Sequence, residues 1–314
     1  MSSRPFHTEG LLMTLYPITV TPSASPRRYP PQRVRRERER AARRRYPGDL
    51  TDAQWAVIAP LVTPVSVGRR GRPPSHPMRA IVTAILYVAC TGCPWRALPR
   101  EFPPPGTVYW WFARWRDDHT LMRLHDRLRE QCRTAAGRHA HPSAGAIDSQ
   151  SVRAADTVPR SSRGFDVAKN VNGRKRHIVV DTMGLLLAVM ITGAHVNDRT
   201  IARDLLWRTR LFHPGLRLLW ADGGYIGTLS TWARQALDLT VQLVHKLPGQ
   251  HTFVVLPRRW VAERTFAWIS KKRRCVRDYE RLPVSHAAFV TWAMNHVMVT
   301  RLARHTKPAQ ATHT

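Results

Sequence analysis

The chain has 314 residues, 43% of them hydrophobic, so it is long enough to bury a core in one or two domains and too apolar to be disordered throughout. It carries 50 Lys and Arg against 21 Asp and Glu, for a formal net charge of +29, and all but six of the basic residues are Arg. Such an excess repels itself unless a polyanion neutralises it, which indicates nucleic acid as the partner and leaves a ribosome-associated or merely basic protein as the alternative.

Residues 1–47 are expected to form a basic, disordered extension. Ten Arg and two Glu lie between Arg27 and Arg45, with three prolines around the start of this run. A run of this kind is either an arm that grips DNA or a solvated tail, and a start codon assigned too far upstream would give the same sequence.

A small helical domain that binds DNA is predicted for residues 48–140. Its first helix begins at a capping box formed by Thr51 and Gln54, because each side chain can bond the other residue's backbone N–H. A second helix is expected to start at Pro77 and to close at Gly92, following the preference of Pro for the first turn and of Gly for the position after the last.

Two further helices complete the predicted helical domain. An aromatic helix is expected to start near Thr107, and a helix with leucines at helical spacing covers residues 121–132. The connection before the aromatic helix is longer than a helix-turn-helix usually has, which argues against that motif. Its three tryptophans are interpreted as core residues rather than as a platform for base stacking: Trp110, Trp111 and Trp115.

The pattern changes at Ala144, and residues 141–305 are predicted to form a mixed five-stranded sheet with helices on both faces. Three strands follow one another directly, and two more arrive through helical crossovers, which is the order of a ribonuclease-H-like α/β domain. A disordered tail is expected at 306–314. The predicted strands cover residues 144–152, 173–184, 185–196, 216–222 and 240–246.

Three acidic residues of this region are candidates for chemistry. Asp148 lies in the middle of the first strand, where an acid is costly unless it sits at an edge or binds something. Asp222 ends the fourth strand before two glycines, at the kind of strand end where open α/β sheets place ligands. Glu263 is one of only three acids after Asp238, and it borders the apolar face of a helix in line with Arg259.

Three converging carboxylates with almost no His or Cys near them suit a hard cation that prefers oxygen ligands, Mg²⁺ or Mn²⁺. Two such ions about 3.5–4 Å apart would activate the attacking oxygen and stabilise the leaving one in phosphodiester transfer. Each acid also has a structural interpretation: Asp148 as a strand-end cap, Asp222 as a turn-former and Glu263 as an ion-pair partner of Arg259 or Arg264. Only their joint placement favours catalysis.

Segments across residues 48–305 resemble, in the same order, the DDE transposases of bacterial insertion sequences, specifically the insertion sequence five group. The resemblance implies that Asp148, Asp222 and Glu263 are the DDE triad. It covers both the helical front and the later half of the chain. The segments that carry it are LTDAQWAVIAPLV, GRRGRPP, ILYVACTGCPWRALPREFPP, TVYWWFARWRDD, AIDSQSVRA, GRKRHIVVDTMG, ADGGYIG and RRWVAERTFAW.

The related superfamily pattern, Y-x2-R-x3-E-x6-K, is matched only in part. Arg259 and Glu263 occupy its Arg and Glu positions, whereas Leu256 stands at the Tyr position and Ser270 at the Lys position. In such enzymes the Lys helps to hold the terminal phosphates, and Lys271 would serve here if the helix shifted by one residue. The lysines that follow Ser270 directly are Lys271 and Lys272.

The resemblance implies a transposase that binds the terminal inverted repeats of an insertion element and catalyses metal-dependent strand cleavage and strand transfer. Metal-activated water would cut at the element's ends, and the freed 3′-hydroxyl would attack target DNA. Its partners would be double-stranded DNA, at the element ends and at the target, and further copies of the chain in a homo-oligomeric complex. The alternatives are an inactive DNA-binding protein and a nuclease that does not transfer strands.

Contacts to DNA phosphates are expected from basic residues in two loops and around the third acid. The segment 169–176 is as readily explained by a solvated hairpin edge as by a phosphate contact. The candidates are Arg69, Arg70, Arg72, Lys169, Arg174, Lys175, Arg176, Arg259, Lys271 and Lys272.

The remaining sequence features concern the compartment. Cys90 and Cys93 form a lone C-x-x-C without a second ligand pair, so structural cysteines in a reducing compartment are expected. No run of about 18 apolar residues exists, so no membrane span is expected. We expect the protein in the bacterial cytoplasm, on the nucleoid.

Overall fold

A computed structural model describes residues 46–62, 75–225, 227–244 and 260–305. Residues 44–314 form one compact unit, and every described element belongs to it. The extension predicted at the N-terminus lies outside the described residues except for its last two, and the tail predicted at 306–314 lies wholly outside them. Within the described ranges, no helix combines the length and the apolar character that crossing a membrane requires.

The four helices predicted in the first half of the chain are confirmed. The capping box is present, with Thr51 N donating to Gln54 Oε1 at 3.0 Å and Gln54 N donating to Thr51 Oγ1 at 3.2 Å. Gly92 ends the second helix in the left-handed conformation, at φ 74°. The helices are α2 (Asp52–Val62), α3 (Met78–Thr91), α4 (Pro105–Asp117) and α5 (Thr120–Ala135), with a 3-10 turn η1 (Trp95–Ala97) before α4.

The tryptophans of α4 are not all core residues. Trp115 is buried and Trp111 packs against the core, as predicted, but Trp110 is 51% exposed. Its ring lies under the guanidinium of Arg114, whose Cζ is 5.0 Å from the ring centroid. The core interpretation is therefore wrong for Trp110, which lies on the outward side of the helix.

All five predicted strands are present, joined by a short sixth strand, β2. β2 was missed because it has only three residues and is held by its pairing with β3, which no local pattern reveals. The hairpin predicted at 182–184 joins β3 to β4, with Gly184 at φ 75°. The strands are β1 (Ala144–Arg153), β2 (Gly164–Asp166), β3 (Val171–Asp181), β4 (Leu186–Gly193), β5 (Leu218–Ala221) and β6 (Thr240–Leu243).

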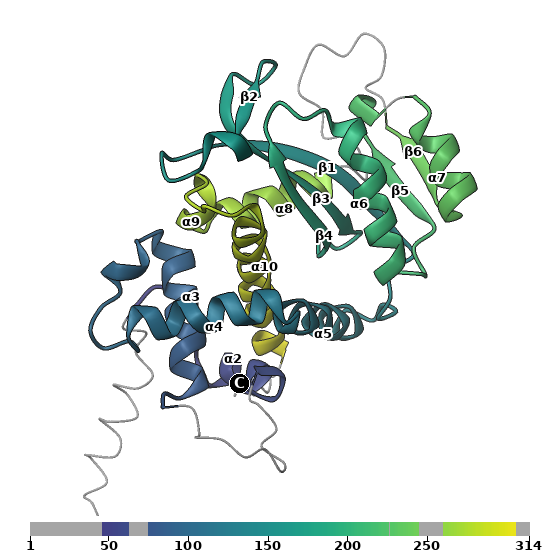
Figure 1. The fold of residues 1–314 in the computed structure, drawn as a ribbon. Coiled ribbons are helices and arrows are strands. Elements are labelled where there is room, and N and C mark those ends of the chain that lie inside the picture. Colours follow the sequence, from purple (N-terminus) through teal and green to yellow (C-terminus); the bar gives the residue numbers. More distant parts are fainter. Residues whose placement is uncertain (1–45, 63–74, 226, 245–259, 306–314) are drawn as a thin grey trace, which may run out of the picture. The chain divides into compact units, whose positions relative to one another are not determined.

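The sheet is mixed, and helices cover both of its faces (Figure 1). The strand order is β2-β3-β1-β5-β6, with β4 also beside β3; β1 is antiparallel to β3 and parallel to β5. This arrangement is the predicted ribonuclease-H-like fold. The remaining helices are α6 (Asp198–Phe212), α7 (Leu229–Leu237), α8 (Trp260–Ser270), α9 (Arg273–Val276) and α10 (Pro283–His305), with 3-10 turns η2 (Arg160–Ser162) and η3 (Gly223–Tyr225).

Alternation along the strands divides the core into two layers. Ile147 and Val179 pack with α6 and α7 on one face, whereas Ala146 and Ile178 pack with α8 and α10 on the other. This second cluster continues without interruption into α2, α3, α4 and α5. The boundary predicted near residue 140 therefore marks a change from helices to strands, while the hydrophobic core runs across it.

His213, at the end of α6, makes folding stability depend on pH. Burial, followed by the positive charge of Arg129, lowers the pKa of His213 to about 4 from its ordinary 6.5. The unfolded chain therefore takes up a proton below pH 6.5 that the folded protein does not, and stability falls as pH drops from about 6.5 to 4, by about 3 kcal/mol in all. Urea unfolding of the parent and His213→Gln between pH 7.5 and 4.5 measures this loss; equal pH dependence in the two proteins would contradict it.

Candidate active site

Asp148 and Asp222 lie side by side where β5 ends. β1 and β5 run parallel with Ala146 opposite Trp220, and the same register continued by two residues places Asp148 opposite Asp222. Neighbouring strands are about 4.8 Å apart, so this register brings the backbones of the two residues close together. The sequence prediction that these two acids converge agrees with this register.

Backbone hydrogen bonds orient both carboxylates. Ser149 N donates to Asp148 Oδ1 at 2.7 Å, and Gly224 N donates to Asp222 Oδ1 at 2.9 Å. A Cβ at Gly224 would stand only 2.9 Å from that same Asp222 oxygen, so a side chain at this position would displace the carboxylate. The second glycine of the sequence DGGY is thereby explained by the carboxylate that it supports.

The pKa of Tyr225 is affected by both acids. Its side chain is buried, and its hydroxyl has no hydrogen-bond partner among the described residues. Burial raises the pKa of Tyr225 well above its ordinary value, and the negative charges of Asp198, Asp148 and Asp222 raise it further. Three carboxylates thus act on one buried hydroxyl, which indicates that Asp148 and Asp222 both lie within electrostatic reach of Tyr225.

Asp148 lies on the face of the sheet that α8 covers. Side chains two apart on a strand share a face, and Ala146 belongs to the core cluster that includes Val261 and Ala262 of α8. The residue opposite Asp148 on β3, Ile178, belongs to the same cluster. The helix that carries the third predicted acid therefore packs on the side of the sheet from which Asp148 projects.

Glu263 lies on the exposed side of α8, at the border of its buried face. The flank of α8 that carries Arg264 and Thr265 touches the β3–β4 hairpin, where both residues donate hydrogen bonds to carbonyl oxygens. At 100° per residue, Glu263 falls on the opposite flank. The hairpin adjoins the amino end of β1, because Asp181 pairs with Gly145. Glu263 therefore lies on the flank of α8 that is turned away from the hairpin.

The other two acids after Asp238 are already neutralised. Asp278 pairs with Arg174 at 2.9 Å and Glu280 with Arg274 at 2.7 Å, and all four side chains are buried. Glu263 is thus the one acid of this part of the chain that is exposed. Over the described ranges, however, no three His, Cys, Asp or Glu side chains are grouped as ligands of one metal ion. The structure brings Asp148 and Asp222 together and leaves Glu263 outside that pair.

Three of the predicted DNA contacts are corrected by the structure. The segment expected as a loop or a hairpin edge belongs to β3, a central strand, and Arg174, Lys175 and Arg176 are buried at 0%, 7% and 0% exposure. Arg174 is held by Asp278, and Arg176 donates to His286 Nε2 at 2.8 Å. These cations hold the fold together and are not available to DNA phosphates.

Sequence reasoning missed a buried polar group on the α6 side of the sheet. Lys175 Nζ lies 3.3 Å from Asp198 Oδ1 and 3.7 Å from Asp166 Oδ2, and His177 Nδ1 lies 3.6 Å from the same Asp198 oxygen. The alternation of Lys175 and His177 along one strand was the available signal, because it places both on one face. Asp198 also acts on Tyr225, because its negative charge contributes to the raised pKa of that residue.

The other predicted contacts have different outcomes. Lys169 is exposed, with Nζ 3.5 Å from the carbonyl oxygen of Ser149, next to the active site, and Lys271 is also exposed. Lys272 instead turns inward, with Nζ 2.7 Å from His296 Nδ1. The predicted contacts Arg69, Arg70, Arg72 and Arg259 lie outside the described residues.

Two models of known protein families match the sequence of this chain. The family model described as "Transposase DDE domain" matches residues 139–298, more than half of the chain. The chain belongs to this family. A second model, described as "Putative transposase of IS4/5 family", matches residues 50–125, so the resemblance inferred from the sequence is confirmed. The DDE domain includes all of β1 to α9, and with them the three predicted acids.

Two relatives from Burkholderia cepacia support the same assignment. The chain is 37% identical over 127 residues to a "Putative transposase for insertion sequence element IS402", a match that covers 38% of this chain and 59% of the relative. It is 35% identical over 109 residues to an "Insertion element IS402 uncharacterized 16.2 kDa protein", covering 33% of this chain and 73% of the relative. No solved structure matches the chain significantly.

Proposed function

We propose that this chain is the transposase of an insertion element, which cuts the element's ends and joins them to target DNA. The observation that carries the proposal is the register of β1 and β5, which sets Asp148 beside Asp222 within the DDE domain. Paired carboxylates on adjacent strands suit phosphodiester chemistry, because they can gather the cations that such a reaction needs. Membership of the family supplies the class of substrate, DNA.

The residues of the site fit a hard divalent cation, Mg²⁺ or Mn²⁺. Asp148 and Asp222 offer carboxylate oxygens, the ligands that these ions prefer, and their charge already acts on Tyr225. Glu263 would complete the ligand set from α8. Bound there, one or two ions would polarise the phosphodiester and stabilise the charge that develops on the attacking and leaving oxygens.

Other groups of the chain would orient the two carboxylates and bind phosphates of the substrate. The backbone N–H groups of Ser149 and Gly224 each hold one oxygen of an aspartate and so help to fix the orientation of the two carboxylates. Lys169 lies close enough to Ser149 to bind a phosphate of the substrate beside the carboxylates. Lys271 is the exposed lysine after α8 and is the better candidate for the terminal phosphates, because Lys272 is engaged by His296.

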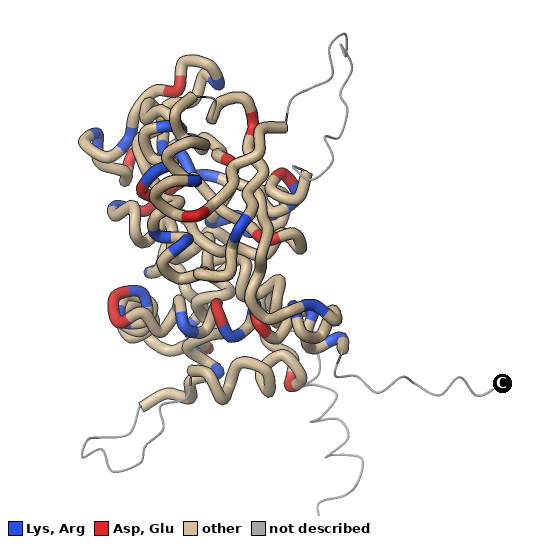
Figure 2. The backbone as a smooth tube through the Cα atoms, turned by 90° about the vertical axis from the view of Figure 1, so that its right-hand side faces the viewer, with Lys and Arg blue, Asp and Glu red and all other residues tan. Residues whose placement is uncertain are grey.

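Positive charge supplies the affinity for DNA. Lys and Arg occur throughout both the helical part and the sheet (Figure 2), and the formal net charge is +29. Binding to the element's terminal inverted repeats and to the target should therefore weaken steeply with salt. We propose that the chain acts on the nucleoid as a homo-oligomer, since two element ends have to be held in one complex.

A strand-transfer assay tests the proposed function. The DNA that flanks the gene supplies the candidate terminal repeats, and a duplex carrying them is incubated with the protein, a supercoiled target plasmid and Mg²⁺. We expect covalently joined products, because a freed 3′-hydroxyl held at the same carboxylates attacks the second DNA. Cutting without joining would identify a nuclease instead, and binding without cutting would identify an inactive DNA-binding protein.

A further inference from the structure

A ladder of alternating aromatic and cationic side chains runs along the outside of α8. We call Trp260, Arg264, Trp268 and Arg301 the cation–aromatic ladder. The first three are spaced four residues apart on α8 and so form one row on the helix. The guanidinium carbon of Arg264 lies 4.1 Å from the ring centroid of Trp260 and 4.8 Å from that of Trp268, and Arg301 of α10 lies 4.3 Å from the Trp268 ring.

The two arginines of the ladder have no acidic partner of their own. Among the described residues, neither forms an ion pair; Arg264 Nη2 donates to the carbonyl oxygen of Met183 at 2.9 Å, while its Nε is buried without a partner. The nearest acid, Asp181, is already bound by Arg133 at 2.5 Å and by two backbone N–H groups. Burial, and then the charge of Arg301, lowers the pKa of Arg264. The ladder therefore carries two positive charges that an anion would stabilise.

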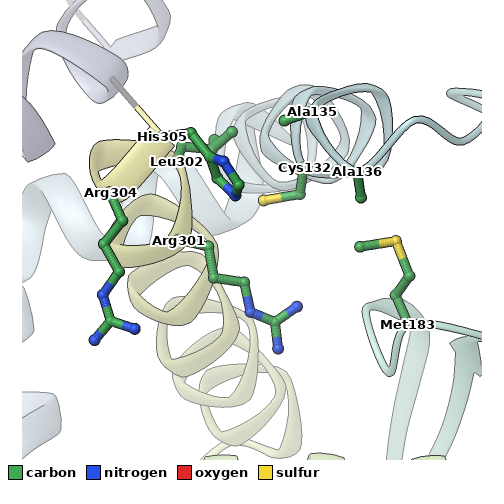
Figure 3. A pocket seen from close by; sticks show the side chains of 8 residues that line it. All are labelled: Cys132, Ala135, Ala136, Met183, Arg301, Leu302, Arg304 and His305. Carbon is green, nitrogen blue, oxygen red and sulfur yellow. The ribbon is translucent and has the colours of Figure 1, made fainter. Parts of the chain in front are cut away.

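The ladder ends at a cavity of about 180 Å³ between α5, the β3–β4 hairpin and the end of α10. Figure 3 shows the guanidinium of Arg301 extending into the space between α10 and Met183. Arg304 and His305 also line the cavity, and it contains no acidic residue. A liquid water occupies about 30 Å³, so the space is ample for a phosphate group.

The other end of the ladder lies beside Glu263. Trp260 precedes Glu263 by three residues, which makes the two side chains neighbours on the surface of α8. From Trp260 to Trp268 the helix rises by about 12 Å, a length that spans roughly three phosphates of one strand of B-form DNA at 3.4 Å each. The ladder thus leads from the third predicted acid to the arginine cavity.

We propose that the cation–aromatic ladder and its cavity bind the sugar–phosphate backbone of a DNA strand that leads away from the catalytic carboxylates. The inference rests on the proposed function, which supplies the strand. Guanidinium groups bind phosphate through paired N–H donors, and stacking between tryptophan rings keeps the plane of Arg264 fixed for such a contact. Trp260, which is 39% exposed, offers a surface on which a base of the same strand stacks.

The test measures the salt dependence of DNA affinity in the full-length protein. Four proteins are compared: the parent, Arg301→Gln, Arg301→Lys and the control Arg208→Gln, which removes an exposed arginine from α6 on the other side of the sheet. Each phosphate contact contributes about 0.9 to the slope of log affinity against log salt concentration. We expect Arg301→Gln to reduce the slope by about one, and Arg301→Lys and Arg208→Gln to leave it unchanged.

The outcomes separate this site from a structural role and from the proposed function. A slope unchanged in Arg301→Gln overturns the inference, as does an equal reduction in Arg208→Gln. If Arg301→Gln fails to fold, Arg264→Gln replaces it in the same comparison. Binding of free phosphate is measured by comparing the thermal unfolding temperature in phosphate with that in chloride at equal ionic strength. If phosphate raises this temperature in the parent but not in Arg301→Gln, while the salt slope of DNA affinity is the same in both, the cavity binds free phosphate and the inference is overturned. A parent that does not join strands contradicts only the proposed function.

Discussion

Replacing Asp148 by alanine is expected to reduce DNA strand cleavage by about a thousandfold or more, with DNA affinity essentially unchanged. The register of β1 and β5 sets Asp148 opposite Asp222, so removal of either carboxylate would take away one of the proposed ligands of the cation. Charge stabilisation by such cations contributes several kcal/mol, and each 1.36 kcal/mol corresponds to a factor of about ten in rate. Single-turnover cleavage of an end-labelled duplex in Mg²⁺ gives the rate, and a binding titration gives the affinity.

Asp204→Ala is the matched control for this prediction. Asp204 is exposed on α6, which covers the face of the sheet opposite to α8, and the variant removes the same charge. Its cleavage rate should equal that of the parent. Equal cleavage by Asp148→Ala and the parent would show that Asp148 is not part of the catalytic machinery. A parallel loss of affinity and cleavage would show that the carboxylate acts through folding or DNA binding instead.

Elements that depend on local chemistry could be predicted from the sequence. The capping box at Thr51, the left-handed Gly92 and the hairpin at Gly184 each need only a few adjacent residues of suitable type. The end of the helix that carries Glu263 is different: α8 ends at Ser270, and Lys272 adopts an extended backbone. Its side chain binds His296, on α10, and this distant partner outweighs the local helical preference.

The candidate site could be predicted from the sequence only in part. Asp148 and Asp222 are conspicuous in the sequence because their strands are hydrophobic and end in recognisable turns, and their catalytic role stays a prediction. The burial of Arg174 and Arg176 could not be predicted, because a run of basic residues is expected to be exposed to solvent unless its buried partners are known. Those partners follow more than a hundred residues later, where Arg174 meets Asp278 and Arg176 meets His286. The relative position of Glu263 likewise depends on how α8 packs across the sheet.

Replacing Asp278 by alanine is expected to lower the free energy of unfolding by about 3–5 kcal/mol. Its carboxylate lies 2.9 Å from Arg174 and 3.0 Å from His286 Nδ1, with all three side chains at 0% exposure. Burial opposes the charged form, but the hydrogen bond from His286, followed by the backbone N–H of Glu280 and the charge of Arg174, holds the pKa of Asp278 below its ordinary value. Without the carboxylate, Arg174 is a buried charge that lacks its counter-ion, and it lies near a second buried cation, Arg176. The free energy of unfolding therefore falls by several kcal/mol. Urea unfolding near pH 7 measures it.

The depressed pKa of Asp278 also fixes how this prediction depends on pH. The unfolded carboxyl titrates near pH 4, so the stabilisation is present above that pH and is lost as pH falls through the lower value of the folded state. The matched control is Asp117→Ala, which breaks an Asp–Arg contact of 2.6 Å at a side chain that is 62% exposed. Exposed pairs contribute little, about 1 kcal/mol at most. If both variants lose the same free energy of unfolding, burial does not account for the contribution of the Asp278–Arg174 pair to stability. The account of β3 as a strand held by buried arginines would then be wrong.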